Sequence, residues 1–152
     1  MPMPWTYRHA SREWRAFLDD VKEAANLTSD NMAYTAVDGV FHVFRARLTA
    51  REGLRFASVL PSVPRAIFVA GWVPEDAPRT FGERADMARE AQGLRPHHNL
   101  TPDNAIDAVA RALWRSVRHA DLDRVLATLP TGAAAFWTVE GADPDDLAPR
   151  MA

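Results

Sequence analysis

Asp38 and His42 are four residues apart in a segment with helical periodicity, so their side chains fall on one face of a helix. A carboxylate that orients an imidazole is the basis of general base catalysis. The chain supplies no partner nucleophile of a known pattern, since it has no cysteine and no Gly-x-Ser-x-Gly. An enzyme with its site near Asp38 and His42 is therefore kept as an alternative, while a place for His42 at the core boundary is the simpler interpretation.

His97 and His98 are the first residues to test for a metal site. Asp86 and Glu90, a few residues upstream, would add carboxylate ligands of the kind that zinc accepts. Adjacent side chains in a loop point apart, however, and no histidine pair at helical spacing supports them. We interpret the segment as a solvated loop.

His119, Asp121 and Asp123 also bring an imidazole and two carboxylates close together. They fall where one helix is expected to end and the next to begin, and each has the charge that the helix dipole favours there. The sequence contains no phosphate-binding glycine loop, dinucleotide motif or calcium loop. We predict no catalytic residues, no bound metal and no cofactor.

Arginine dominates the basic residues: seventeen of the eighteen basic side chains are arginines, in a chain of net charge −2. Between positions 45 and 65 there is one glutamate and there are five arginines: Arg45, Arg47, Arg51, Arg55 and Arg65. Arginine is suited to bidentate contacts with carboxylate or phosphate. We predict that these residues bind an acidic partner, with a plain solvated surface as the alternative.

The acidic end of the chain could regulate that surface. Residues 140–152 contain four acids against one arginine and are predicted to be disordered. A tethered tail has a high effective concentration, so it could cover the arginines.

Trp5 lies in a proline-flanked start and belongs to no apolar stripe, unlike Trp14, Trp114 and Trp137. An exposed tryptophan is a frequent anchor for a partner or a sister subunit, so Trp5 joins the predicted partner-binding residues. A fold-back of this arm onto its own domain is the alternative. Trp72 is expected to pack at the hinge of a linker.

The composition is that of an ordinary globular domain, with 47% hydrophobic and 25% charged residues. Apolar residues recur at helical spacing through most of the chain, and no alternating strand pattern stands out. Capping boxes are predicted at Thr49 to Glu52 and at Thr80 to Glu83. The elements expected from these signals are helices at about 11–25, 29–48, 49–60, 65–72, 80–92, 102–118, 120–129 and 133–137.

The chain also repeats itself. Leu27-Thr28-Ser29-Asp30-Asn31 matches Leu100-Thr101-Pro102-Asp103-Asn104, and a Leu-Pro break follows in each copy. We predict an all-α fold of two tandem repeats of about four helices each, packed as one pseudo-twofold domain. The predicted organisation is an arm at 1–10, repeat one at 11–72, a linker at 73–79, repeat two at 80–139 and the tail at 140–152.

This order of motifs resembles a bacterial family catalogued as domain of unknown function 2267. The residues that carry the resemblance are Arg45-Ala46-Arg47-Leu48, Ser58-Val59-Leu60-Pro61, Gly71-Trp72-Val73-Pro74, Phe81 with Glu83, and Thr128-Leu129-Pro130 with Phe136-Trp137. The resemblance covers residues 10 to 139. It implies a tandem helical repeat and no particular reaction.

Taken together, these patterns favour a non-enzymatic protein-interaction or assembly module. Its partner would be an unknown protein or a second copy of the chain, and the charge balance makes nucleic acid a poor candidate. A small-ligand binder in the cleft between the repeats is the second hypothesis. No apolar run is long enough to span a membrane and no secretory signal begins the chain, so we expect a cytoplasmic protein.

Overall fold

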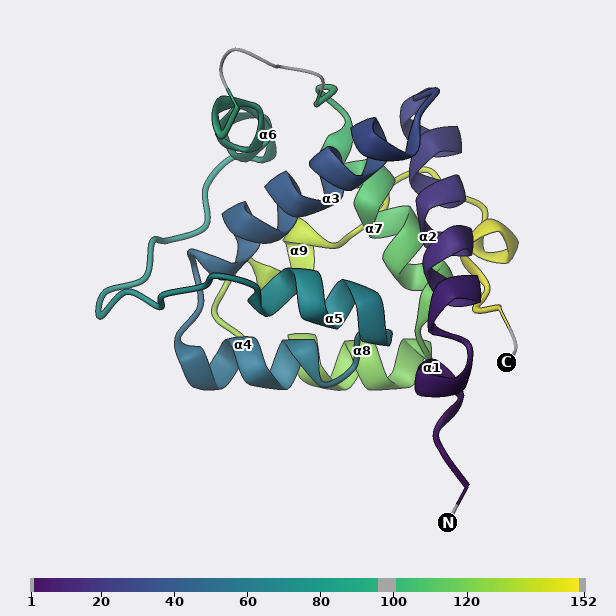
Figure 1. Cartoon of the computed structure of the whole chain (residues 1–152). Coiled ribbons are helices and arrows are strands. Elements are labelled where there is room, and N and C mark those ends of the chain that lie inside the picture. Colours follow the sequence, from purple (N-terminus) through teal and green to yellow (C-terminus); the bar gives the residue numbers. More distant parts are fainter. Residues whose placement is uncertain (1, 96–100, 151–152) are drawn as a thin grey trace.

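The computed structural model describes residues 2–95 and 101–150, which are helical and contain no β-strand (Figure 1). The predicted all-α class is therefore confirmed for this part of the chain. In chain order the elements are α1 (Trp5–Arg8), α2 (Ala10–Ala25), α3 (Asp30–Arg45), α4 (Ala50–Ala57), α5 (Ser62–Val69), α6 (Arg84–Gly93), α7 (Ala105–Ser116), α8 (His119–Leu126), α9 (Ala133–Phe136) and a 3₁₀ turn η1 (Pro144–Leu147).

The first half follows its sequence signals closely except at α5, which lies at Ser62–Val69 instead of the expected 65–72. Helix α2 ends at Asn26 in the left-handed conformation, with φ 54°, which is a common way to stop a helix. Ser29 caps α3, since its side chain accepts a hydrogen bond from the Met32 amide. The predicted capping box at Thr49 and Glu52 is present in full at α4.

The starts of α6 and α7 differ from the prediction. No capping box forms at Thr80, because its carbonyl accepts from Arg47 and α6 begins only at Arg84. Helix α7 begins at Ala105, since residues 103–104 form a turn and Thr101 is buried with its carbonyl bonded to Gln92. Both shifts come from contacts between segments, which local patterns do not encode.

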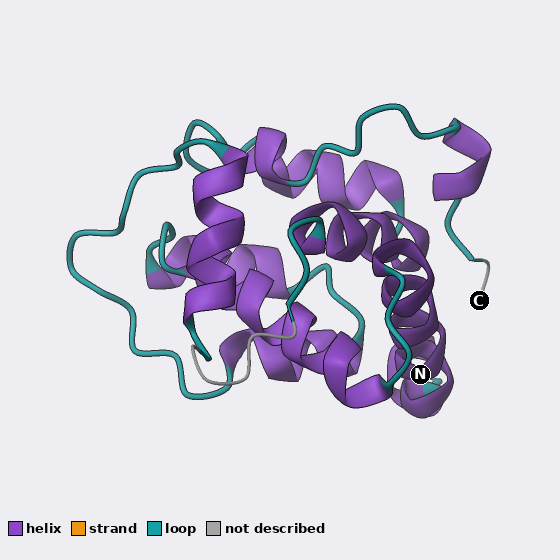
Figure 2. Cartoon of the chain, turned by 90° about the horizontal axis from the view of Figure 1, so that it is seen from above, coloured by secondary structure: helices purple, strands orange, loops and turns teal. Residues whose placement is uncertain are grey.

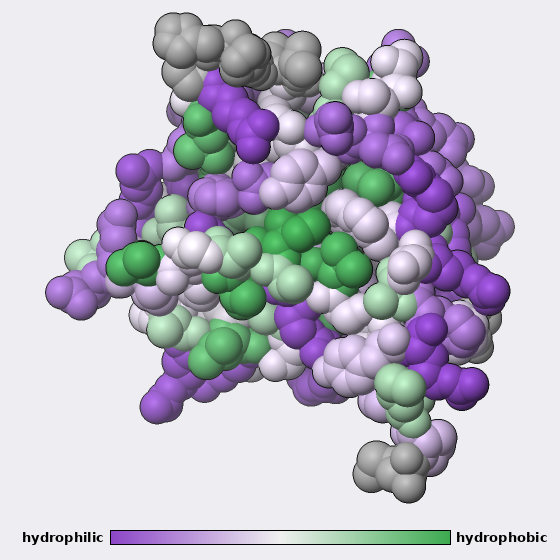
Figure 3. Space-filling model, in the orientation of Figure 1, coloured by the Kyte–Doolittle hydropathy of each residue, from purple (hydrophilic) through white to green (hydrophobic). Residues whose placement is uncertain are grey.

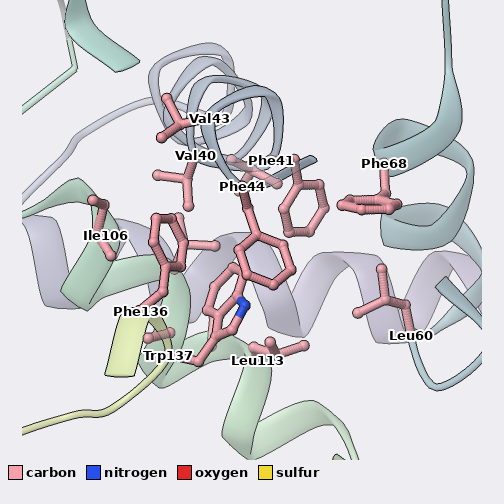
Figure 4. Packing of buried hydrophobic residues seen from close by; sticks show 14 of the residues in the cluster. Val40, Phe41, Val43, Phe44, Leu60, Phe68, Ile106, Leu113, Phe136 and Trp137 are labelled. Atoms are coloured by element: carbon pink, nitrogen blue, oxygen red, sulfur yellow. The ribbon is translucent and has the colours of Figure 1, made fainter. Parts of the chain in front are cut away.

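An aromatic cluster fills the centre of the molecule (Figure 4). Phe44 lies 5.0 Å from Phe136 and 5.1 Å from Trp137 between ring centroids, and Phe41 packs edge-on against Phe68 at 5.5 Å. Trp114 packs at the edge of the cluster, where its indole N–H donates to the Trp137 carbonyl at 2.7 Å. Side chains from both halves of the chain therefore share one core.

Helices of each half pack against helices of the other half. Helix α2 of the first half packs most extensively on α7 of the second, α6 of the second half packs on α3 of the first, and α4 lies beside α8 (Figure 1). This exchange is what a twofold axis between the halves would produce. The pseudo-twofold repeat itself stays a prediction, to be measured by superposing the halves.

The linker between α5 and α6 stands away from the helices in both views (Figure 1, Figure 2). Among the helices of the described residues, none has the length and apolar character needed to cross a membrane.

Candidate partner-binding groove

A groove of about 830 Å³ lies where the N-terminal helix meets the corner between α4 and α5. Trp5 belongs to its α1 wall, Leu60 and Pro61 to the corner, and Val117 and Val125 to the α7–α8 side. Trp5 keeps 38% of its surface exposed, so an aromatic face is open to solvent at this place. The apolar lining could receive a side chain of a partner.

The α1 wall is fixed by hydrogen bonds that span much of the sequence. The Ser62 amide donates to Thr6 Oγ1 at 2.7 Å, and the Ser62 hydroxyl donates to the Thr6 carbonyl at 2.7 Å. Arg65 donates to the hydroxyl of Tyr7 at 2.9 Å. Helix α1, within the arm that the sequence placed at 1–10, therefore folds back onto the α4–α5 corner and completes the groove.

The groove lining contains four arginines and two carboxylates in a protein of net charge −2. Arg55 and Arg118 are exposed, and neither guanidinium forms a hydrogen bond or an ion pair within the described residues. Arg124 is paired with Asp121 at 3.1 Å. The free cations give the groove a local positive charge that an anionic partner would neutralise.

Glu13 adds one unmet hydrogen-bonding group. This residue lines the groove, and its Oε1 atom is buried without a donor among the described residues. A buried acceptor without a partner costs free energy on the order of 1–3 kcal/mol.

The predicted partner-binding residues divide into three groups. Trp5, Arg55 and Arg65 converge on the groove, and Arg51 is exposed on α4 outside its lining. Arg45 and Arg47 do not belong to the surface, since they are only 6% and 8% exposed. Their interior position corrects the expectation that all five arginines are available to a partner.

Arg45 and Arg47 hold internal segments together. Arg45 donates to the carbonyls of Phe68 and Ala70 at 2.9 and 3.0 Å, at the end of α5. Its burial lowers the pKa of the guanidinium below its ordinary value. Arg47 donates to the Thr80 carbonyl at 3.1 Å and to Glu90 at 2.8 Å, which fixes the far end of the linker.

Part of the arginine excess has a shared structural role, which the sequence alone did not reveal. Arg45, Arg65 and Arg84 each donate to several backbone carbonyls at the end of a helix, at α5, α4 and α9 respectively. The last carbonyls of a helix have no partner within it. Arginine meets several of them at once because its planar group carries five donors, which lysine cannot match.

His42 stands over a second cavity, of about 660 Å³, between α3, α6 and the linker. Its Nδ1 lies 2.7 Å from the Asp38 carbonyl and 3.4 Å from the Asp38 carboxylate. Arg79 and Glu90 line the same cavity, but no serine, threonine, tyrosine or cysteine does among the described residues. The arrangement orients an imidazole and provides no nucleophile, so it offers less chemistry than the groove offers for binding.

The other histidine groups have separate outcomes. His119 Nε2 lies 3.0 Å from the Trp114 carbonyl and 2.8 Å from that of Leu147, so it joins α7 to the tail. No group of three metal-binding side chains is present in the part of the chain that the structure describes. The predicted pair His97 and His98 lies outside the described residues.

The tail differs from its predicted role. The sequence predicted a disordered segment that covers the arginines, whereas the structure packs the 3₁₀ turn η1 (Pro144–Leu147) against α7. The Arg150 amide donates to the Arg115 carbonyl at 2.9 Å, and its guanidinium pairs with the buried Asp20. Its acidic residues Asp145 and Asp146 therefore face Arg111 and Arg115 instead of the groove.

The fold and the site define an all-helical domain whose two halves share one core and whose surface carries a positively charged, partly apolar groove. The chain belongs to the family of uncharacterised conserved proteins DUF2267, whose family model matches residues 14–136. A search of curated proteins finds no match. The family description names no reaction and no ligand, so the function is argued from the groove.

Proposed function

We propose that the protein is a non-enzymatic interaction module that binds an acidic protein segment in the groove beside Trp5. The observation that carries the proposal is the pair of exposed, unpaired cations, Arg55 and Arg118, on the rim of an apolar lining. Charged rims guide association and apolar pockets supply affinity, so this groove fits a partner with acids around an apolar anchor. The proposal keeps the cytoplasmic location expected from the sequence.

The two acidic residues of the lining, Glu13 and Asp121, favour a peptide over a simple polyanion. A peptide backbone brings N–H donors together with acidic side chains, whereas a nucleic acid strand brings phosphates that Glu13 and Asp121 would repel. The cleft beside His42 and a reaction at Asp38 and His42 have less support, because Glu90 in that cleft already binds both Arg47 and Arg79.

Binding of short labelled peptides tests the proposal. A peptide that combines several acids with one leucine or phenylalanine should bind at low salt, and a basic peptide with the same apolar residue should not. Charge reversal at Arg55 and Arg118 should weaken binding by roughly a hundredfold, since like charges then face each other. Trp5→Ala should weaken it by about tenfold or more through loss of the anchor surface.

The matched control is Arg51→Glu, which reverses an exposed charge on the same helix as Arg55 but outside the groove lining. This variant should bind as the wild type does, apart from a small long-range effect that salt removes. Equal loss of binding in the control and in the groove variant would contradict the proposal. Preferential binding of a single-stranded oligonucleotide would also contradict it.

A further inference from the structure

The linker between α5 and α6 carries apolar and acidic side chains that complement the apolar, basic groove. Val73 is 83% exposed, and the residues after it are Pro74, Glu75 and Asp76. Neither acid forms an ion pair within the described residues. The tip of the linker therefore presents an apolar side chain next to two free carboxylates.

We infer that the linker of one copy of the chain docks in the groove of a second copy. The inference rests on the proposed function of the groove and names its occupant. Two unpaired acids, Glu75 and Asp76, complement two unpaired arginines, Arg55 and Arg118, and Val73 supplies the apolar anchor for the lining beside Trp5.

The linker is held in shape before it binds. At one end the Trp72 ring lies against Gly53 and 5.9 Å from the Arg45 guanidinium, and at the other Phe81 lies against Gly132. The Arg79 amide also donates to the Ala46 carbonyl at 3.0 Å. A loop anchored at both ends loses less conformational entropy on docking than a free peptide, which favours this occupant over a disordered one.

The geometry directs this contact between copies. The linker projects from one side of the molecule and α1 lies at the opposite side, in both views (Figure 1, Figure 2). A linker therefore reaches the groove of another copy instead of its own. Contacts of this head-to-tail kind lead to rings when the rotation closes and to open chains when it does not.

The face that carries α5 is apolar in its middle and polar towards its edges (Figure 3). The linker leaves the end of α5 at this face, so the docked tip would extend an apolar surface from one copy to the next.

Sedimentation velocity on the full chain tests the inference over roughly a hundredfold range of concentration at low salt. The wild type should show a mass that rises with concentration and falls with added salt. Charge reversal in the linker (E75K with D76K) or in the groove (R55E with R118E) should each raise the concentration for half-assembly by roughly a hundredfold.

The decisive arm combines the two changes. A chain with all four substitutions has lysines in the linker and glutamates in the groove, so attraction is restored and assembly should return to within about tenfold of the wild type. Arg51→Glu is again the control and should assemble normally. Circular dichroism of each variant should match the wild type, because every substituted side chain is exposed.

Two results would overturn the inference. One is a wild type that stays monomeric throughout the range, and the other is a fourfold variant no better assembled than the two double variants. If acidic peptides still bind the groove in an Arg55- and Arg118-dependent way, the proposed function stands and only the second copy is excluded as its occupant. If no acidic peptide binds either, both fail.

Discussion

The two ends of the linker are built from the same parts in different ways. At each end an aromatic ring covers a glycine, and an arginine guanidinium lies near the ring. The first group is Trp72 with Gly53 and Arg45, and the second is Phe81 with Gly132 and Arg47. The guanidinium lies 5.9 Å from the first ring and 6.0 Å from the second. We call the first group, Trp72 with Gly53 and Arg45, the first seat of the linker. The second seat is Phe81 with Gly132 and Arg47.

The two seats differ in how much stability a substitution in them should remove. Gly53 lies in α4 and would contact only the outer edge of the Trp72 ring, whereas Gly132 has φ 99° and would contact the Cβ of Phe81. Arg45 bonds only backbone carbonyls, while Arg47 also has a carboxylate partner in Glu90. The first seat can adjust by moving a side chain, and the second requires a particular backbone and charge.

The largest expected effect is at Gly132. In Gly132→Ala the new Cβ would lie 2.5 Å from the Phe81 Cβ at a φ that only glycine adopts easily. Backbone strain and overpacking together should lower the free energy of unfolding by about 4 kcal/mol. Urea unfolding measures it. Gly71→Ala, with φ 64° in open space, is the control, and its free energy of unfolding should fall only by the contribution of backbone strain. Equal losses in the two variants would show that Phe81 moves aside without cost.

The next effect concerns charge at the second seat. Glu90→Gln removes the carboxylate that Arg47, 8% exposed, bonds at 2.8 Å. We expect a loss of about 2 kcal/mol, the usual range for a hydrogen bond to a charged group. Asp38→Asn, near the first seat, removes no hydrogen bond from Arg45 and should cost less than half as much. Thermal unfolding of both variants decides the order, and a larger loss in Asp38→Asn would reverse the comparison.

The smallest effect is expected at Gly53. In Gly53→Ala the new methyl would meet Trp72 ring atoms at 2.2 Å, so the ring must move outward. The lost packing is partly offset by the better helix propensity of alanine, for a net loss of about 1 kcal/mol. A red shift of tryptophan emission should accompany it and vanish in a Trp72→Phe background. Gly82→Ala, in open space, should leave both quantities unchanged.

Local signals predicted the elements well where the partner atoms are close in sequence. The capping box of Thr49 and Glu52 forms because both residues belong to one turn. The similar pattern at Thr80 and Glu83 does not form, because Thr80 is engaged by Arg47 from another segment. The family resemblance, carried by the order of several motifs, is confirmed over residues 14–136.

The site was predicted only in part for a related reason. Arg45 and Arg55 look alike in the sequence, but one bonds carbonyls 23 and 25 residues away and the other stays exposed. Charge density alone cannot separate the two cases. A signal was present in the spacing of Arg65 after Pro61, since that distance lets an arginine reach back to the end of α4. The contribution of Arg118 to the groove had no local signal.

The exchange of packing partners between the halves also bears on how the chain acquires its fold. The apolar stripe of α2 is covered chiefly by α7, and the two helices are separated by all of the residues from 26 to 104. Closing that long loop must precede the main gain in burial. During synthesis α2 therefore lacks its main packing partner until α7 has left the ribosome, and its apolar stripe is fully buried only when the second half arrives.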